Sequence, residues 1–229
     1  MLSVNELRVS YGMSEVIHGV SLNVGANETV AIMGRNGMGK TTLFKSLIGM
    51  LPSTAGEIRF RGDDLTRAES YQRVAKGIAY VPQGRMVFPT LTVEENIKAG
   101  LEASGRKKVP NDIYELFPVL FDMRHRKAGN LSGGQQQQLA IGRALAADPK
   151  VLLLDEPTEG IQPSIIKQLA VTLNEIKQLR KISIVVSEQV LSFATAVADR
   201  MLVIDKGRIV HEAEGEQIDK AYISKFLSV

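Results

Sequence analysis

The sequence contains no cysteine and only three histidines in 229 residues. The absence of cysteine excludes disulfide bonds, thiolate metal sites and cysteine nucleophiles. No apolar run approaches the roughly 18 residues that a membrane-spanning helix requires. The first residues contain no basic segment followed by an apolar stretch, so no signal peptide is expected. These absences favour a soluble cytoplasmic protein.

The overall composition is that of an ordinary globular chain. Hydrophobic residues make up 44% and charged residues 23%, which excludes disordered and fibrous classes. The net charge of +3 is too small to indicate a nucleic-acid partner by itself. Basic residues gather at Arg106–Lys108 and Arg124–Lys127, but no aromatic residues are interleaved with them. Solvated loops are therefore the simpler interpretation of these segments, and no nucleic acid is expected.

Apolar strand patterns alternate with helical patterns along most of the chain. The expected strands are Leu2–Val9, Val16–Val24, Thr29–Met33, Glu57–Arg61, Ile78–Val81, Val151–Leu154, Ser183–Val186, Met201–Ile204 and Arg208–His211. The expected helices are Lys40–Gly49, Arg67–Lys76, Val93–Ala103, Asn111–Leu120, Gln135–Ala147, Pro163–Arg180, Val190–Ala198 and Gly215–Leu227. Continuous apolar strands alternating with helices predict an α/β fold with a mostly parallel sheet.

The middle of the chain has a different character. Between Pro82 and Pro149 the sequence becomes more polar and helical. We interpret residues from about 83 to 149 as a helical insertion into a sheet domain formed by residues 1–82 and 150–229. The 229 residues then make one domain.

A glycine-rich segment follows the apolar strand that ends at Met33. Gly34–Thr41 has the pattern Gly-x4-Gly-Lys-Thr between a strand and a helix, which is the context that gives this pattern its meaning. The glycines allow successive N–H groups to point at phosphate oxygens, and the helix N-terminus adds its positive dipole end. Lys40 would bridge the β- and γ-phosphates, and the Thr41 hydroxyl would bind Mg²⁺. The residues predicted to bind nucleotide here are Gly34, Arg35, Asn36, Gly37, Met38, Gly39, Lys40, Thr41 and Thr42. The alternative is an ordinary glycine-rich turn.

Two carboxylates follow the apolar strand that begins at Val151. At the end of a central strand, Asp155 would hold Mg²⁺ through water, and Glu156 would polarise the attacking water as the catalytic base. The alternative is an acidic cap on the next helix, and the phosphate-binding pattern elsewhere in the chain makes that interpretation weaker.

A second candidate anion site is present at Leu131–Gln135. A serine and two glycines at the start of a helix offer exposed N–H groups and a hydroxyl donor. One γ-phosphate does not need two such sites from one subunit. We therefore expect Ser132, Gly133, Gly134 and Gln135 to bind a nucleotide held by a partner subunit. A plain helix cap would explain the serine but not both glycines.

Four motifs follow one another along the chain: Gly34–Thr41, Gln83, Leu131–Gln135 and Asp155–Glu156. In this order they resemble the nucleotide-binding subunits of ATP-binding cassette (ABC) transporters, and the resemblance covers essentially the whole chain. The resemblance implies a P-loop NTPase core, an antiparallel β subdomain on the N-terminal side and an inserted α-helical subdomain. It also implies that two subunits sandwich two ATP molecules with Mg²⁺, and that hydrolysis drives bound membrane subunits.

The resemblance assigns roles to two further residues. Tyr11 resembles the family's aromatic residue that stacks on adenine, with a plain core tyrosine as the alternative. Gln83 resembles the glutamine that touches Mg²⁺ and relays to the membrane subunit. The implied metal ligands are thus Thr41, Gln83 and Asp155.

The sequence departs from the family pattern at two positions. Gln189 stands where the family normally has a histidine that contacts the γ-phosphate. Glutamine can donate a hydrogen bond but cannot carry a proton, and we expect Gln189 to join Glu156 as a catalytic residue. Gln162 stands where the family commonly has an aspartate, in the loop that meets the partner. Both changes affect the geometry expected during the catalytic cycle, but neither removes the nucleotide site.

These departures resemble a subgroup of importers. Glu159–Pro163 and Ser187–Gln189 are similar to the smaller ATPase of branched-chain amino acid importers. Gln135–Ile141 and Thr158–Ile165 look most like the urea-importer version, with the short-chain amide version nearby. None of these motifs touches the solute, so they report ancestry. We expect urea as the solute, with a branched-chain amino acid or short-chain amide as the alternative.

In such importers the partners are a different second ATPase subunit, two membrane permeases and, indirectly, a periplasmic solute-binding protein. The chain would lie at the cytoplasmic face of the inner membrane as a peripheral subunit. For the isolated chain, a homodimer is the alternative to the pairing with a different subunit. Two other classes are weaker. A cassette acting on DNA or the ribosome usually carries two cassettes or a long coiled-coil insertion, which this sequence lacks. A regulatory, non-hydrolysing nucleotide binder fits Gln189 but not Glu156.

Overall fold

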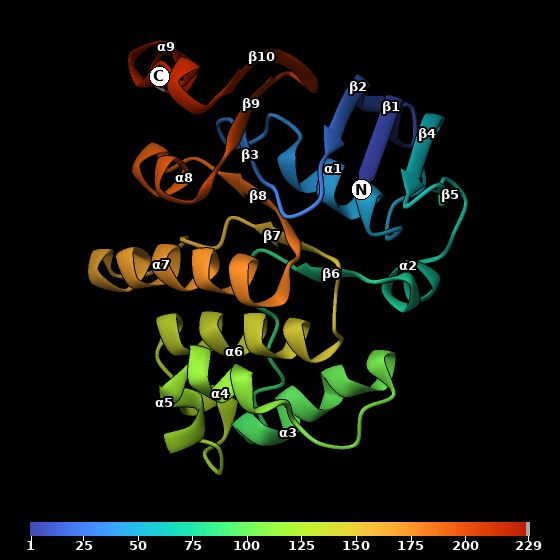
Figure 1. The fold of residues 1–229 in the computed structure, drawn as a ribbon. Coiled ribbons are helices and arrows are strands. Elements are labelled where there is room, and N and C mark those ends of the chain that lie inside the picture. Colours follow the sequence, from blue (N-terminus) through green and yellow to red (C-terminus); the bar gives the residue numbers. More distant parts are fainter. Residues whose placement is uncertain (228–229) are drawn as a thin grey trace.

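The computed structural model describes residues 1–227, which form two β-sheets and their covering helices (Figure 1). One sheet has four strands in the order β2-β1-β4-β5, and the other has six in the order β10-β9-β3-β8-β7-β6. The strands are β1 (Leu2–Tyr11), β2 (Ser14–Val24), β3 (Thr29–Met33), β4 (Ala55–Phe60), β5 (Asp63–Asp64), β6 (Ile78–Val81), β7 (Val151–Asp155), β8 (Ser183–Glu188), β9 (Arg200–Asp205) and β10 (Arg208–Glu214). The helices are α1 (Lys40–Leu47), α2 (Ser70–Lys76), α3 (Val93–Ala99), α4 (Asn111–Leu116), α5 (Pro118–Asp122), α6 (Gly133–Ala146), α7 (Pro163–Arg180), α8 (Leu191–Val197) and α9 (Lys220–Leu227).

The six-stranded sheet is parallel except for β10, which pairs antiparallel with β9. All residues of β3, β7 and β8 are buried, because both faces of the sheet are covered. Strands of this kind are continuously apolar, and this is the pattern on which the α/β prediction rests. The prediction of an α/β fold with a mostly parallel sheet is confirmed.

The four-stranded sheet is antiparallel and lies at the N-terminal side, as expected. Its strand β1 alternates buried and more exposed positions except around Glu6, where φ is +47° and the pairing register shifts. The buried face packs with α1 against one side of the six-stranded sheet, in a shared apolar cluster. The other side of that sheet packs against helices α3–α9.

Helices α3–α6 lie at the opposite end of the molecule from the antiparallel sheet (Figure 1). Three expected helices were wrong in detail. The helix expected over Asn111–Leu120 breaks at Phe117, because Pro118 disfavours helical backbone at the residue before it. The helix expected over Val93–Ala103 ends at Ala99 and continues as a 3₁₀ turn, Gly100–Ser104. The helix expected over Gly215–Leu227 is a 3₁₀ turn, Gly215–Gln217, followed by α9. The break at Phe117 could have been inferred from the proline.

A tight turn between β9 and β10 joins the two sheets next to the glycine-rich loop. Gly207 accepts a hydrogen bond from His18 N at 2.9 Å and donates one to Met38 O at 3.0 Å. Its φ is +73°, and a Cβ there would lie 1.8 Å from Val16 O. Only glycine fits this turn, which fixes the glycine-rich loop against β2.

Across residues 1–227, no helix is both long enough and apolar enough to pass through a membrane.

Candidate functional site

The carboxyl ends of β3, β7 and β8 meet at one edge of the six-stranded sheet. In the parallel register Met33 pairs with Glu188, and Asp155 pairs with Ser187. The segments that follow these strands therefore emerge side by side, which is where open α/β sheets place their ligand sites.

A cavity of about 330 Å³ opens at this edge. Its lining residues come from the glycine-rich loop, α1, β2, the segment after β6 and the segment after β7. They are Val16, Asn36, Gly37, Gly39, Lys40, Thr41, Thr42, Gln83 and Glu156. Gly39 caps α1 with a φ of +102°, so the loop turns directly into the helix N-terminus. Backbone N–H groups at a helix N-terminus favour an anion.

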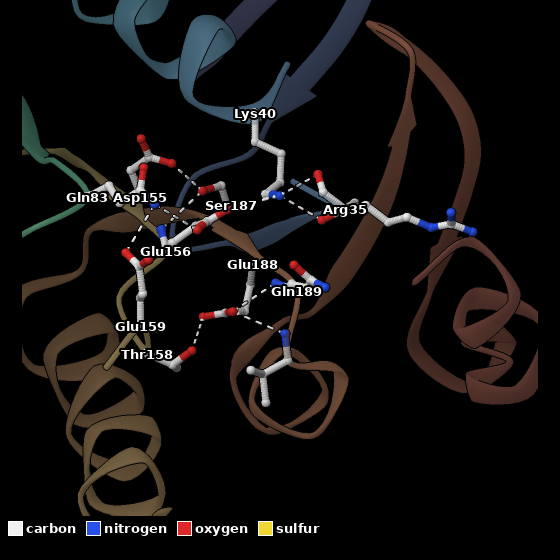
Figure 2. Close-up of polar contacts among 12 residues, drawn as sticks. Arg35, Lys40, Gln83, Asp155, Glu156, Thr158, Glu159, Ser187, Glu188 and Gln189 are labelled. Atoms are coloured by element: carbon white, nitrogen blue, oxygen red, sulfur yellow. Dashed lines mark hydrogen bonds and ion pairs between the residues drawn. The ribbon is translucent and has the colours of Figure 1, made fainter. Parts of the chain in front are cut away.

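The ammonium group of Lys40 is buried at the centre of the site (Figure 2). It donates hydrogen bonds to Gly34 O at 2.6 Å and Arg35 O at 2.9 Å. It also forms an ion pair with Glu156 Oε1 at 2.9 Å. A buried charge is tolerated when it is paired and hydrogen-bonded in this way.

Three of the nucleotide contacts predicted in the glycine-rich segment do not line the cavity: Gly34, Arg35 and Met38. The Arg35 side chain extends away from Lys40 (Figure 2) and donates to Phe226 O of α9 at 3.1 Å. The Met38 sulfur accepts from Lys206 N at 3.4 Å. The main chain of these three residues shapes the loop, while the side chains of Arg35 and Met38 fasten it to α9 and to the β9–β10 turn. The sequence pattern did not distinguish residues that shape the loop from residues whose side chains anchor it to neighbouring elements.

Asp155 is buried and has both carboxylate oxygens occupied by hydroxyl donors. Ser187 Oγ donates to Oδ1 at 2.5 Å, and Tyr80 OH donates to Oδ2 at 3.2 Å. Burial, together with the Asp155 charge, raises the pKa of Tyr80 far above its usual value, so the phenol stays a donor. Sequence reasoning missed Tyr80 and Ser187. The pairing of Asp155 with Ser187 could have been found only by aligning β7 with β8.

Glu156 follows β7 with a φ of +47°, a conformation that costs a residue with a side chain roughly 1–2 kcal/mol. Its N–H group is held by Ser187, through the carbonyl oxygen and Oγ, both at 3.1 Å. The carboxylate contacts Lys40 and accepts from Gln83 Nε2 at 3.2 Å. The turn therefore places the Glu156 carboxylate in the cavity, whereas Asp155 does not line the cavity.

Gln189 and Tyr11 lie outside the cavity lining. Gln189 is exposed directly after β8, and its backbone N–H donates to Glu188 Oε1 at 2.8 Å. Tyr11, at the end of β1, is 48% exposed. That exposure removes the alternative of a plain core tyrosine and leaves an aromatic face open to a ligand.

Ser132 begins α6 in a reciprocal cap with Gln135. Gln135 N donates to Ser132 Oγ at 3.3 Å, and Ser132 N donates to Gln135 Oε1 at 2.9 Å. A Cβ at Gly134 would lie 2.8 Å from Ile165, and one at Gly133 would lie 3.1 Å from the Arg85 guanidinium. Close packing against Ile165 thus gives a reason for Gly134 besides anion binding, whereas the neighbour of Gly133 is the movable end of an arginine side chain. None of these residues lines the Lys40 cavity, so binding a partner's nucleotide stays a prediction.

The oxygen donors around the cavity suit Mg²⁺. Thr41 and Gln83 both line it, and the buried Asp155 lies beside Glu156. Mg²⁺ is usually held in proteins by one or two carboxylates together with substrate phosphates. Among residues 1–227 no cluster of three or more His, Cys, Asp or Glu side chains could hold a metal without such help. The donor set therefore fits Mg²⁺ that arrives with a phosphate ligand.

Comparison with known proteins gives the same family throughout. The family model described as "ABC transporter" matches residues 17–159. The chain is 41% identical over 220 residues to the high-affinity branched-chain amino acid transport ATP-binding protein BraG of Pseudomonas aeruginosa, covering 94% of this chain and 93% of that one. It is 32% identical to the probable branched-chain amino acid transport ATP-binding protein LivF of Archaeoglobus fulgidus, covering 95% and 94%.

Solved structures with this fold include a nucleotide-free ATP-binding cassette from an ABC transporter. It superposes with a TM-score of 0.84 at 28% identity, covering 100% of this chain and 95% of that one.

The buried carboxyl group of Glu188, at the end of β8, has a raised pKa that can be tested through its effect on stability. Its buried carboxyl group accepts hydrogen bonds from Gln189 N, Val190 N and Thr158 Oγ1. Burial nevertheless raises its pKa above the ordinary 4.5, so the folded state keeps the proton over a pH range in which the unfolded chain has released it. The free energy of unfolding contributed by Glu188 must then fall as pH rises through that range.

We therefore expect Glu188→Gln to gain stability relative to the unmodified protein as pH rises above the ordinary glutamate pKa of 4.5. Urea unfolding of both proteins across this range measures the difference. Glu175→Gln, at an exposed position of α7, serves as the matched control. A Glu188→Gln difference that is constant with pH would contradict the assignment.

Proposed function

The chain belongs to the ABC transporter family of ATPases, and on that basis we propose that it powers the import of branched-chain amino acids. The solute assignment rests on the relative in Pseudomonas aeruginosa, a high-affinity branched-chain amino acid transport ATP-binding protein that matches over 94% of this chain. The chemistry rests on the cavity at the ends of β3, β7 and β8.

The glycine-rich loop would hold the phosphates of ATP through its N–H groups, with Lys40 supplying the positive charge. Mg²⁺ would be held by Thr41, Gln83 and, through water, Asp155, and it would neutralise charge on the β- and γ-phosphates. Tyr80 and Ser187 orient the Asp155 carboxylate through their hydrogen bonds to its two oxygens. Tyr11 would stack on adenine at the open side of the site.

Glu156 is the proposed general base. Its carboxylate is paired with Lys40, and phosphate oxygens at the loop would compete for the same ammonium group. Binding of nucleotide would thus free the carboxylate to accept a proton from the attacking water. Gln189 would donate a hydrogen bond to the γ-phosphate but cannot exchange a proton, which leaves Glu156 as the base at this edge of the sheet.

The active assembly would be a pair of ATPase subunits bound to two membrane permeases at the cytoplasmic face of the inner membrane, with a periplasmic solute-binding protein. Ser132, Gly133, Gly134 and Gln135 would complete the nucleotide site of the partner subunit. We propose a different chain as that partner, from the subgroup resemblance and from Gln162 in the loop expected to face it. Residues from about 83 to 149 would form the helical subdomain, and Gln83 would relay to the membrane subunit.

Urea is the second candidate solute. Gln135–Ile141 and Thr158–Ile165 resemble the urea-importer subgroup, but they lie on α6 and at the start of α7 and report ancestry. The amino acid assignment has the support of a relative matched over almost its full length. Uptake of labelled leucine and of labelled urea, compared in a deletion strain with and without the restored gene, separates the two. Restored urea uptake without leucine uptake would replace the amino acid assignment.

We expect Glu156→Gln to lower steady-state ATPase activity at least about a hundredfold, because it removes the proton acceptor, while ATP binding is retained. Activity is measured in the assembled transporter. Lys40→Ala is the comparison: it should lose both binding and turnover, since no other cavity residue supplies that charge. Equal activity of the unmodified protein and Glu156→Gln would exclude this base.

We expect Ser132→Arg to leave ATP binding by the single subunit unchanged and to prevent the closed dimer, because the bulky cation would block the surface offered to the partner's nucleotide. Calorimetry measures ATP affinity, and size-exclusion chromatography with ATP and the partner ATPase subunit, in the Glu156→Gln background, measures dimer formation. Loss of ATP affinity in the single subunit would place Ser132 in its own site instead.

A further inference from the structure

A third carboxylate, Glu159, meets Gln83 beside the proposed base. Gln83 Nε2 donates to Glu159 Oε2 at 3.0 Å and to Glu156 Oε2 at 3.2 Å (Figure 2). Glu156 is neutralised by Lys40 at 2.9 Å. Within residues 1–227, the carboxylate of Glu159 has Gln83 as its one hydrogen-bond or ion-pair partner. The mechanism above gives Glu159 no role.

The two carboxylates together fix which end of the Gln83 amide faces them. An amide NH₂ group has two protons, while its oxygen can only accept. Both protons are directed at Glu156 and Glu159, and no described residue donates to Gln83 Oε1. The opposite amide orientation would place an oxygen against two carboxylate oxygens, which is repulsive. The amide oxygen is therefore the end left for a cation.

The main chain of Glu159 is held independently of its carboxylate. Arg85 Nη2 donates to Glu159 O at 2.7 Å and also reaches Gly160 O at 3.4 Å. Glu159 N donates to Glu156 O at 3.2 Å. The loop that carries Gln83 and Arg85 thus contacts Glu159 at its carbonyl oxygen and at its carboxylate. The main-chain contact places the carboxylate for its hydrogen bond with Gln83.

We propose that Glu159 is a positioning residue that orients the Gln83 amide so that its oxygen is available to the divalent cation. The inference depends on the proposed role of Gln83 toward Mg²⁺. Glu159 is exposed and remote from the apolar core, so its removal leaves folding intact, and an effect on cation binding can be separated from an effect on stability. A carboxylate that is merely solvated would leave cation binding unchanged.

The test is a Mn²⁺ titration of the full chain with a non-hydrolysable ATP analogue, followed by electron paramagnetic resonance. We expect Glu159→Ala to raise the Mn²⁺ concentration at half-saturation about three- to tenfold, which corresponds to the net contribution of one typical hydrogen bond. Affinity for the metal-free analogue should not change. Glu159→Gln, which keeps an acceptor oxygen, should recover most of the loss, and the exposed Glu175→Ala should match the unmodified protein.

Gln83→Ala distinguishes failure of this inference from failure of the proposed function. If Gln83→Ala weakens Mn²⁺ binding and Glu159→Ala does not, Glu159 does not orient the amide, and the role of Gln83 stands. If neither substitution changes Mn²⁺ binding, Gln83 is not a cation ligand and both statements are overturned. If Glu159→Ala and Glu159→Gln lose affinity equally, the amide orientation is not the cause, and the inference fails.

Discussion

The parallel register of β3, β8 and β7 is the constraint on which the site depends. Because Met33 pairs with Glu188 and Ser187 pairs with Asp155, three chain segments leave the sheet at the same level. The glycine-rich loop, the two carboxylates and the segment carrying Gln189 are brought together by backbone hydrogen bonds before any of their side chains interact. A slip of one residue in either pairing would turn these side chains to the other face of the sheet.

Each buried charge at this edge of the sheet is satisfied by neighbouring polar groups. Lys40 is satisfied by two carbonyl oxygens and Glu156, and Asp155 is satisfied by two hydroxyl groups. Each arrangement removes the cost of a bare buried charge, yet none uses a permanent cation next to Asp155. The site therefore stays intact as a folded structure while keeping its carboxylates available to a ligand that brings its own positive charge.

Much of this architecture could be predicted from the sequence, since continuous apolar strands and the Gly34–Thr41 pattern between a strand and a helix are local signals. What could not be predicted depends on residues far apart in the chain. The partnership of Tyr80 and Ser187 with Asp155 needs three strands in register. The outward turn of Arg35 toward α9 needs the position of a helix almost two hundred residues later. Gly134 showed the limit of local reasoning, because the side chain of Ile165, from α7, packs closely against it.

The Gly207 turn has a mechanical consequence. Its two backbone hydrogen bonds join β2, the glycine-rich loop and the β9–β10 hairpin to one another. We expect a change caused by a bound ligand to pass through parts of the chain that these bonds do not tie. The segment from Gln83 to Arg85 is such a part, held to the loop after β7 by a few side-chain contacts. This segment follows β6 and leads toward α3, so it connects the edge of the sheet that carries the Lys40 cavity to helices α3–α6.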